Sequence, residues 1–401
     1  MKKEIEDARI REQEEAELKE LLNFCTIPTI EDFSQFIEEH RRTWSMQKLG
    51  EASYSEVYAA LHARTKQSTV LKIMPFGRKD MEQASIQDIS NELKISKTMM
   101  RFDGFVDVVG AYIVKGEYPE HLLTLWDQYA DLKESENERP DFYDEEQKFC
   151  IVMLQNGGTD LEHFKLKSWR EAATVFWRVA KSIAKAEQAV EFEHRDLHWG
   201  NIVLDRKKSE VSDMIEKLSL QDTKEVYAVN IQVTIIDYTL SRARCGDEGV
   251  VFSSMDDPAL YNGRGDYQFD IYRFVRNSNQ RRRSGKPTQR FDWSLYVPRT
   301  NTLWLHYLAE RLIREKNLTE PRVVGSGSNT RAASRRGGKA AAESSQAEID
   351  AYRSLDLVFK LIDPRKRRFG AGKKAGGGVV AEIGTAGDLV AWGREEGIVY
   401  E

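Results

Sequence analysis

The stretch HRDLHWGN at residues 194–201 decides the fold. Residues 175–192 before it carry apolar side chains at helical spacing, and the apolar run Ile202-Val203-Leu204 follows it. The stretch is therefore predicted to be a loop held between two packed elements. In such a loop Asp196 can accept or orient a hydroxyl proton, and Asn201 can supply an oxygen ligand to magnesium. An acid and an amide at this spacing suit phosphoryl transfer.

A second acid downstream supports this interpretation. The β-rich run at 233–236 ends at Asp237, the position at which a second magnesium ligand is expected. An HRD triplet alone is more often a chance occurrence or a solvated turn. Asn201 and Asp237 together make that bland alternative the poorer explanation.

Composition excludes several classes of protein. The chain of 401 residues is 40% hydrophobic and 31% charged, which predicts a soluble protein with two or three domains or one large two-lobed domain. A net charge of -5 argues against a whole-protein nucleic-acid binder. No apolar run predicts a membrane helix, and the charged N-terminus is unlike a secretory signal. Three scattered cysteines predict reduced thiols in a cytosolic or nuclear protein.

A candidate phosphate loop lies near the N-terminus. Residues 44–74 are predicted to form three strands, the first two joined by a hairpin of small residues that starts at Gly50. By itself this hairpin is better explained as an ordinary turn. The third strand contains Lys72 within an apolar run, and a lysine there needs a partner. Glu92, on the helix predicted to follow, is the candidate partner of Lys72.

A candidate hinge follows two further predicted strands, at 105–114 and 149–154, which are separated by a polar insertion at 126–144. The second strand runs into Gln155-Asn156-Gly157 and then Asp160. Adenine would bond to the hinge backbone, and Asp160 would lie near the ribose or a cationic substrate side chain. Alternatively Asp160 is the N-cap of a helix that starts at Leu161. The two interpretations are compatible.

The other segments predict mostly helices. Residues 1–25 predict one long exposed helix, 29–42 a second helix with Thr29 and Asp32 as capping residues, and 162–192, 302–312 and 349–362 further helices. In the apolar helix near residue 270, Asp270 is predicted to be structural and to accept hydrogen bonds from the catalytic-loop backbone, whereas Asp266 is better placed to meet a substrate.

Polar and basic segments interrupt these helices. Residues 205–224 predict a hairpin excursion, 280–290 a basic excursion and 323–346 a flexible insert. The basic cluster at 365–368 is either a nuclear-import signal or a solvated turn. Residues 370–374 lack the residues that a P-loop requires.

Over residues 46–312 these motifs together resemble the haspin family of atypical protein kinases. The resemblance rests on the loop at 194–201, the segment IIDYTLSR at 235–242, the blocks at 265–273 and 303–308, and ERPDF at 138–142. It implies an α+β, bilobal protein-kinase fold, with a small β-rich N-lobe (43–154) and a larger helical C-lobe (155–322). A helical extension (1–42) would precede the lobes, and a flexible insert (323–347) and a helical tail (348–401) would follow.

The resemblance also implies a role for each matching residue. Asp196 would be the catalytic base, Lys72 would hold the ATP phosphates and pair with Glu92, Asn201 and Asp237 would bind Mg2+, and Leu154 would be the gatekeeper. Asp160, His198 and Asp266 would bind the substrate. The implied ATP-binding residues are Leu49, Gly50, Glu51, Ala52, Ser53, Tyr54, Ser55, Val57, Lys72, Gln155, Asn156, Gly157, Asp160, Asn201 and Asp237. Lys72, Asp196, Asn201 and Asp237 are expected to converge on one ATP–magnesium pocket.

The family further implies a threonine near the N-terminus of the histone H-three tail as the phosphate acceptor, in mitotic chromatin. A monomeric, chromosome-associated nuclear protein with a cytoplasmic pool is expected, without sequence-specific nucleic-acid binding and without a membrane partner. Ala52, Ser55 and Arg264 depart from the family pattern; Arg264 stands where the family tends to carry an acid, which would repel a basic tail. Two alternatives stay open: a pseudokinase-like binding scaffold with weak or no catalysis, and a small-molecule phosphotransferase.

Overall fold

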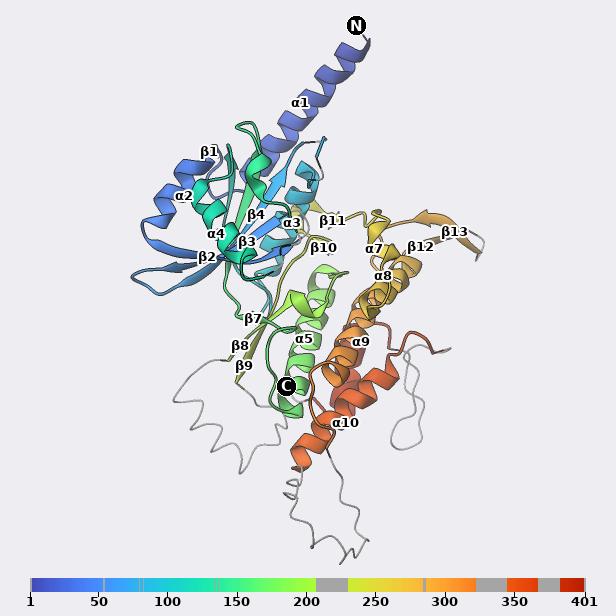
Figure 1. Ribbon diagram of the computed structural model, residues 1–401. Coiled ribbons are helices and arrows are strands. Elements are labelled where there is room, and N and C mark those ends of the chain that lie inside the picture. The colour runs from blue at the N-terminus through green and yellow to red at the C-terminus, as the bar shows by residue number, and fades with distance from the viewer. Residues whose placement is uncertain are drawn as a thin grey trace, which may run out of the picture. The chain divides into compact units, whose positions relative to one another are not determined.

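The computed structural model describes residues 2–52, 55–78, 80–81, 83–133, 135, 137–206, 230–283, 286–321, 345–366 and 383–399 (Figure 1). Several predicted features therefore lie outside the described residues: Ser53 and Tyr54 of the phosphate loop, nearly all of the 205–224 excursion, almost the whole 323–347 insert, the second half of the 365–368 cluster and the segment 370–374. The chain divides into two compact units. The first comprises residues 1–157 and 237–254, and the second 158–236 and 255–401.

The first unit is built on a six-stranded sheet in the order β1-β5-β6-β4-β3-β2. The strands are β1 (Ile30–Asp32), β2 (Trp44–Ala52), β3 (Ser55–His62), β4 (Ser68–Phe76), β5 (Val108–Lys115) and β6 (Lys148–Gln155), so the three strands predicted within 44–74 are present. All neighbours are antiparallel except β1 and β5, which are parallel. Residues 69–76 of β4 pair with residues 148–155 of β6, with Lys72 opposite Val152.

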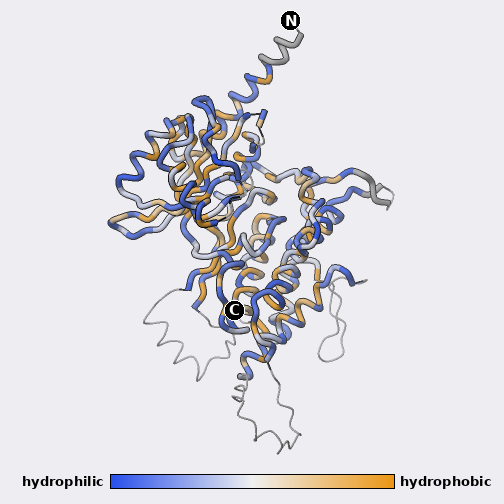
Figure 2. Tube along the Cα trace, viewed as in Figure 1, coloured by the Kyte–Doolittle hydropathy of each residue, from blue (hydrophilic) through white to orange (hydrophobic). Residues whose placement is uncertain are grey.

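Both faces of this sheet are covered, because side chains alternate along each strand. In β6, Phe149, Ile151 and Met153 join one apolar cluster, and Cys150 and Val152 join another. The first cluster includes residues of α2 (Phe33–Arg41) and α4 (Glu120–Ala130), and the second includes residues of α1 (Lys2–Asn23) and α3 (Ile86–Met99). Figure 2 shows hydrophobic stretches of chain in the region of this sheet.

Two helices of the first unit differ from the prediction. The N-cap of α2 is Asp32, whose side chain accepts a hydrogen bond from Gln35 N, and not Thr29, because residues 30–32 pair as a strand with β5. The start of the segment 126–144 was predicted to be too polar for the core. Residues 120–130 instead form α4, and Trp126 is buried at 9% exposure.

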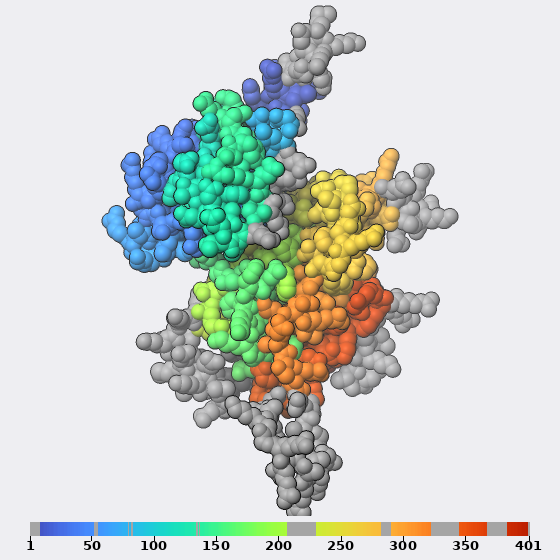
Figure 3. Space-filling view, viewed as in Figure 1, coloured from blue at the N-terminus to red at the C-terminus, as the bar shows by residue number. Residues whose placement is uncertain are grey.

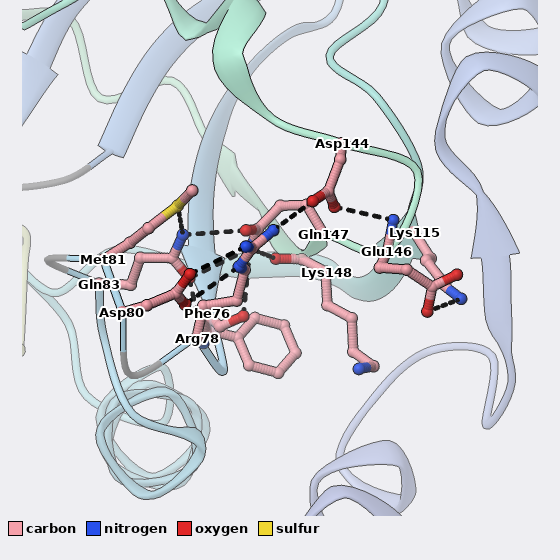
Figure 4. Close-up of polar contacts among 10 residues, drawn as sticks. All are labelled: Phe76, Arg78, Asp80, Met81, Gln83, Lys115, Asp144, Glu146, Gln147 and Lys148. Atoms are coloured by element: carbon pink, nitrogen blue, oxygen red, sulfur yellow. Dashed lines mark hydrogen bonds and ion pairs between the residues drawn. The ribbon is translucent and has the colours of Figure 1, made fainter.

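A polar network fastens the connection between β4 and α3, the helix that carries Glu92 (Figure 4). The side chain of Gln147 is fully buried; its amide nitrogen donates to the carbonyl oxygens of Phe76 (3.2 Å) and Lys148 (2.7 Å). It also bonds the Gln83 side chain at 2.9 Å. Arg78 pairs with Asp144 at 2.5 Å near the surface. The buried amide contributes more stability than the exposed ion pair, because water screens exposed charges.

The short pieces at 237–254 belong to the first unit and include β10 (Arg242–Arg244) and β11 (Val250–Phe252), which pair with each other. Asn91 of α3 donates a hydrogen bond to the carbonyl oxygen of Phe252 at 3.1 Å. The segment that follows Asp237 is therefore fixed to the helix that carries Glu92.

The second unit is mostly helical around α5 (Trp169–Val190), whose N-cap is Ser168. The helix predicted at 162–192 therefore begins later than expected, because residues 161–168 form a turn and an irregular segment. Its other elements are the sheet β7 (Thr159–Asp160), β8 (Ile202–Arg206) and β9 (Ile231–Ile235), the hairpin β12 (Gln280–Arg283) and β13 (Lys286–Phe291), and the helices α7 (Ala259–Asn262), α8 (Tyr267–Ser278), α9 (Arg299–Arg314), α10 (Gln346–Leu361) and α11 (Ala386–Glu395). Helices α9 and α10 lie side by side on the face shown in Figure 3.

The two units give the predicted α+β, bilobal protein-kinase fold, with a β-rich unit at the N-terminal side and a larger helical unit. Within the part of the chain that the structure describes, no helix is long and apolar enough to cross a membrane.

Candidate active site

Lys72 is the centre of an ionic cluster in the first unit. Its Nζ lies 2.7 Å from Glu92 Oε1 and 3.5 Å from Asp237 Oδ1, so the predicted ion pair with Glu92 is present. Burial by itself would lower the pKa of Lys72, but the carboxylates of Asp237 and Glu92 outweigh burial and raise that pKa above its ordinary value. Lys72 is therefore a permanent cation held between two acids.

Thr239 completes the cluster, and sequence reasoning missed this role. Its hydroxyl bonds Asp237 Oδ1 at 2.6 Å, Glu92 Oε2 at 3.0 Å and Lys72 Nζ at 3.3 Å. Asp237 has a positive φ of 64°, and its carboxylate also accepts from Thr239 N at 3.1 Å. A hydroxyl residue two positions after an acid is a local signal for such a turn. Three segments far apart in the sequence thus meet at one hydroxyl group.

The candidate phosphate loop is the β2–β3 hairpin, whose register shifts between Lys48 and Gly50. A Cβ added at Gly50 would meet no atom within 4 Å, so the space beside its backbone is open. Two predicted ATP-binding side chains point elsewhere. Glu51 bonds Lys48 at 2.7 Å and Ser135 at 2.5 Å, and the Ser55 hydroxyl is buried without a partner among the described residues. If these two residues contact ATP, they do so through their backbone groups.

A buried lysine stabilises this hairpin from within. Lys48 is 7% exposed, and its Nζ pairs with both Glu51 and Glu56 and lies 4.4 Å from the ring centre of Tyr129. Asn137, from the insertion before β6, donates to Glu56 Oε1 at 3.0 Å. Burial raises the pKa of Glu56, although Lys48 and Asn137 oppose this effect. The insertion is therefore tied to the predicted phosphate loop.

At the candidate hinge, part of the backbone is already bonded within the first unit. Gln155 N donates to Asp107 O at 2.9 Å, and Asn156 N donates to Ser68 O at 3.3 Å. Adenine would therefore need other backbone groups of the hinge. Leu154, the predicted gatekeeper, is partly buried beside the second apolar cluster.

Gly158 and Asp160 open the second unit. Gly158 has a φ of +110°, and an added Cβ would lie 2.1 Å from Leu204 O, so only glycine fits. Asp160 Oδ1 accepts from His163 N at 2.9 Å and contacts His163 Nδ1 at 2.8 Å. Asp160 therefore caps a turn, but the alternative interpretation was wrong about the helix, because no helix starts at Leu161 and the next one begins at Trp169. The Asp160 side chain stays partly exposed.

The loop 194–201 places Asp196 among polar partners in the second unit. Tyr272 of α8 donates a hydrogen bond to Asp196 Oδ1, and Asn201 Nδ2 donates to the Asp196 carbonyl oxygen at 2.9 Å. His198 Nε2 lies 4.0 Å from Asp196 Oδ2, while His198 Nδ1 accepts from Gly200 N at 3.1 Å. Tyr272 is separated from Asp196 by 76 residues, and no spacing in the sequence indicated this bond.

Buried polar residues hold the backbone of this loop. Arg195 is fully buried with a φ of 64°, and its guanidinium bonds Glu193 at 3.2 Å and the Trp293 carbonyl oxygen at 2.9 Å. Glu193 in turn accepts from Val297 N at 2.8 Å and Thr300 Oγ1 at 2.7 Å. A buried charge is tolerated only with such partners. The loop conformation is therefore fixed by the segment that leads into α9.

The role predicted for Asp270 was wrong in its partner. Asp270 is exposed on α8 and pairs with Arg273 at 2.6 Å, and Arg273 donates to the carbonyl oxygens of Tyr261 and Gly263. The contact predicted for Asp270 is made instead by Asn301 of α9, whose Oδ1 accepts a hydrogen bond from His194 N at 3.0 Å. The helical pattern placed Asp270 on an apolar helix but on the solvent side of it.

Asp266, a predicted substrate-binding residue, is engaged on both sides. It is the N-cap of α8 and accepts from Gln268 N at 2.7 Å, and it pairs with Arg311 of α9 at 2.5 Å. Arg311 also lies over the rings of Trp199 (5.3 Å) and Tyr307 (5.0 Å). The charge of Asp266 is thus partly compensated within the chain.

The predicted magnesium ligands fit that ion by their chemistry. Asn201 donates a hydrogen bond through Nδ2 to the Asp196 carbonyl oxygen, so its side-chain oxygen Oδ1 can act as a metal ligand. Asp237 can supply a carboxylate oxygen. Mg2+ prefers oxygen ligands and is bound by one or two protein groups together with waters and phosphate oxygens. Among the described residues there is no group of three or more His, Cys, Asp or Glu side chains that could hold a metal by themselves.

Comparisons with known proteins agree with this geometry. The family model "Haspin like kinase domain" matches residues 4–331. The chain is 42% identical over 348 residues to a serine/threonine-protein kinase haspin homolog of Schizosaccharomyces pombe, covering 83% of this chain and 64% of that protein. It is 36% identical over 284 residues to the serine/threonine-protein kinase haspin of Mus musculus, covering 67% of this chain and 36% of that protein. The match is thus to part of each longer relative. With the family model spanning most of its length, the chain belongs to the haspin-like kinase family.

Proposed function

We propose that the protein is a Mg2+-dependent Ser/Thr protein kinase that transfers the γ-phosphate of ATP to a threonine near the N-terminus of the histone H-three tail. The observation that carries the proposal is the cluster in which Lys72 Nζ contacts Glu92 at 2.7 Å and Asp237 at 3.5 Å. A lysine fixed by an acid on a helix, beside a metal-binding acid, is the arrangement that kinases use for ATP phosphates.

Within this proposal each unit supplies its own part. In the first unit Lys72 binds the α and β phosphates, Asp237 binds magnesium, and the backbone of the β2–β3 hairpin covers the nucleotide. In the second unit Asn201 supplies a further oxygen ligand to magnesium. The bound ion neutralises phosphate charge when present.

Asp196 is the proposed catalytic base, which accepts or orients the proton of the acceptor hydroxyl. The Tyr272 hydroxyl bonds one carboxylate oxygen of Asp196, and Asn201 Nδ2 lies 3.5 Å from the other, which limits the orientations that the carboxylate can take. Tyr272 is therefore a positioning residue for the base in this proposal.

A cationic substrate tail suits the acids that remain accessible. Asp160 and His198 are partly exposed, whereas Asp266 shares its charge with Arg311, and Arg264 is an exposed cation two residues before it. We expect the cationic groups of the tail to be bound mainly by Asp160, with His198 as a polar contact, and with weaker selectivity than two free acids would give. Action in mitotic chromatin, nuclear localisation and a monomeric state belong to the same proposal.

Incubation with magnesium, labelled ATP and a histone-tail peptide tests the activity. Asp196→Ala should lower kcat by roughly 100- to 10,000-fold, the usual cost of losing a general base. Equal labelling by both proteins would refute the proposal. Nucleotide titration distinguishes a kinase from a binding scaffold. ATP at about 100 times its Kd should raise the free energy of unfolding of a kinase by about 2.7 kcal/mol. It should leave that of a scaffold that does not bind ATP unchanged. Peptide arrays with Arg264→Asp test substrate choice.

A further inference from the structure

Glu187 of α5 is a buried carboxylate that does not contact any predicted site residue. It is 5% exposed, and its oxygens accept hydrogen bonds from Asn301 Nδ2 (2.9 Å), Ala386 N (3.2 Å) and Gly387 N (3.3 Å). The last two are the first residues of α11, whose amides have no partner within the helix. A negative charge is favourable at that end of a helix.

Asn301 carries this contact on to the loop of Asp196. It is fully buried, and its Nδ2 also donates to Phe192 O at 2.8 Å, while its Oδ1 accepts from His194 N at 3.0 Å. One amide group therefore holds both the carbonyl that precedes the loop and the amide two residues before Asp196. Because it is shared with Glu187, its orientation depends on that carboxylate.

Helix α11 is fastened to α5 by more than these bonds. A Cβ added at Gly393 would lie 2.8 Å from Trp177 Cη2 of α5 and 2.9 Å from a methyl carbon of Val399. Leu389 of α11 is fully buried. The matched family domain ends at residue 331, so α11 lies beyond it. A segment outside the matched domain is thus packed against the support of the catalytic loop.

We propose that α11 is a positioning element for the catalytic loop, acting through Glu187 and Asn301. With α11 in place, its two amides fix Glu187, Glu187 fixes the Asn301 amide, and Asn301 holds the loop backbone that presents Asp196. With α11 displaced, Glu187 turns toward other donors and the loop backbone loses a fixed partner. The consequence for phosphoryl transfer rests on the proposed function; the consequence for the loop does not.

Hydrogen exchange of full-length variants tests the coupling without any activity. Gly393→Leu displaces α11 by a clash with Trp177 and leaves Glu187, Asn301 and both donor amides unchanged in sequence. We expect faster exchange in α11 and, with it, exchange of the His194 amide at least about tenfold faster, the effect of losing one buried hydrogen bond. Glu187→Gln should give the same change at His194. Gly384→Ala is the control, since Gly384 precedes α11, makes no bond to Glu187, and its added Cβ would meet only Asp388 Oδ2 at an ordinary 3.8 Å.

The proposal is overturned if α11 exchanges faster in Gly393→Leu while His194 keeps its protection. If Gly393→Leu fails to fold, the same exchange measurement on Ala386→Pro tests the proposal. It removes one donor at the first helical position, where proline is tolerated, and unchanged protection of His194 would again overturn the proposal. Kinase assays on the same variants should show a lower kcat with an unchanged KM for ATP. A wild-type protein without kinase activity would refute the proposed function and leave the exchange result intact.

Discussion

The hydroxyl of Tyr272 is a single atom whose removal tests how Asp196 is positioned. Tyr272 is 6% exposed, and its ring packs edge-on against Trp304 at 5.2 Å between ring centres. Tyr272→Phe keeps these ring contacts and deletes the bond of the hydroxyl to Asp196 Oδ1. The side chain of Asp196 is 18% exposed, so water replaces the lost donor only in part.

The size of the effect follows from the type of bond. A hydrogen bond to a charged group contributes roughly 1.5–3 kcal/mol, and each 1.4 kcal/mol is a factor of about ten in rate, so kcat should fall roughly 10- to 100-fold. The KM for ATP should not change, because the Tyr272 hydroxyl bonds the proposed base Asp196, which is not among the residues assigned to the nucleotide. The free energy of unfolding should change little, since the buried ring remains.

The assay is steady-state transfer of labelled phosphate to a histone-tail peptide. Tyr267→Phe is the matched control, because Tyr267 begins the same helix and its hydroxyl bonds His306 Nδ1 at 2.8 Å, away from Asp196. We expect Tyr267→Phe to keep the wild-type kcat. A Tyr272→Phe enzyme with the same kcat as its control would show that Asp196 is positioned without this hydroxyl, and the reasoning would be wrong.

Three further outcomes are expected. Glu92→Gln removes the 2.7 Å ion pair of Lys72 and should lower kcat/KM for ATP roughly 10- to 100-fold in steady-state kinetics. Glu20→Gln is the control, since it removes one of the two ion pairs of Lys94 on the same helix and leaves the pair with Glu248. Lys48→Met leaves buried Glu56 and the mostly buried Glu51 without their shared cation and should cost about 3–5 kcal/mol of unfolding free energy in urea, whereas exposed Lys133→Met should cost almost nothing. Burial raises the pKa of Glu187 from 4.5 to about 7, so the folded chain keeps a proton in that interval that the unfolded chain releases. Wild-type stability relative to Glu187→Gln should therefore fall as the pH rises from 4.5 to 7, by up to about 3 kcal/mol, and equal pH dependence in urea unfolding would contradict this.

The features predicted correctly from the sequence depend on local patterns. Lys72 is conspicuous as a charge inside an apolar strand, and Glu92 lies on the next helix. Their ion pair could therefore be predicted from the order of these two elements along the chain. The strands of the first unit and the long helix before the catalytic loop were likewise visible as runs of apolar residues.

The contacts that hold the catalytic loop were not predictable in this way. Asn301 bonds His194 across 107 residues, and Tyr272 bonds Asp196 across 76. Neither residue type signals a role by itself, because Asn and Tyr satisfy their polar groups in many settings. Asp270 was chosen instead because an acid in an apolar helix is conspicuous, yet its side chain faces solvent. Which side of a helix is buried depends on tertiary packing, and a short helix of mixed polarity leaves that choice open.

The amide of Asn301 has a consequence for how this protein can change over evolutionary time. It gives hydrogens to the Glu187 carboxylate and to the Phe192 carbonyl, and takes one from His194. An aspartate there would place two acids against each other, and a glutamine at position 187 would then relieve the conflict. Positions 187 and 301 should therefore covary across related kinases, with each change at one site accompanied by a compensating change at the other.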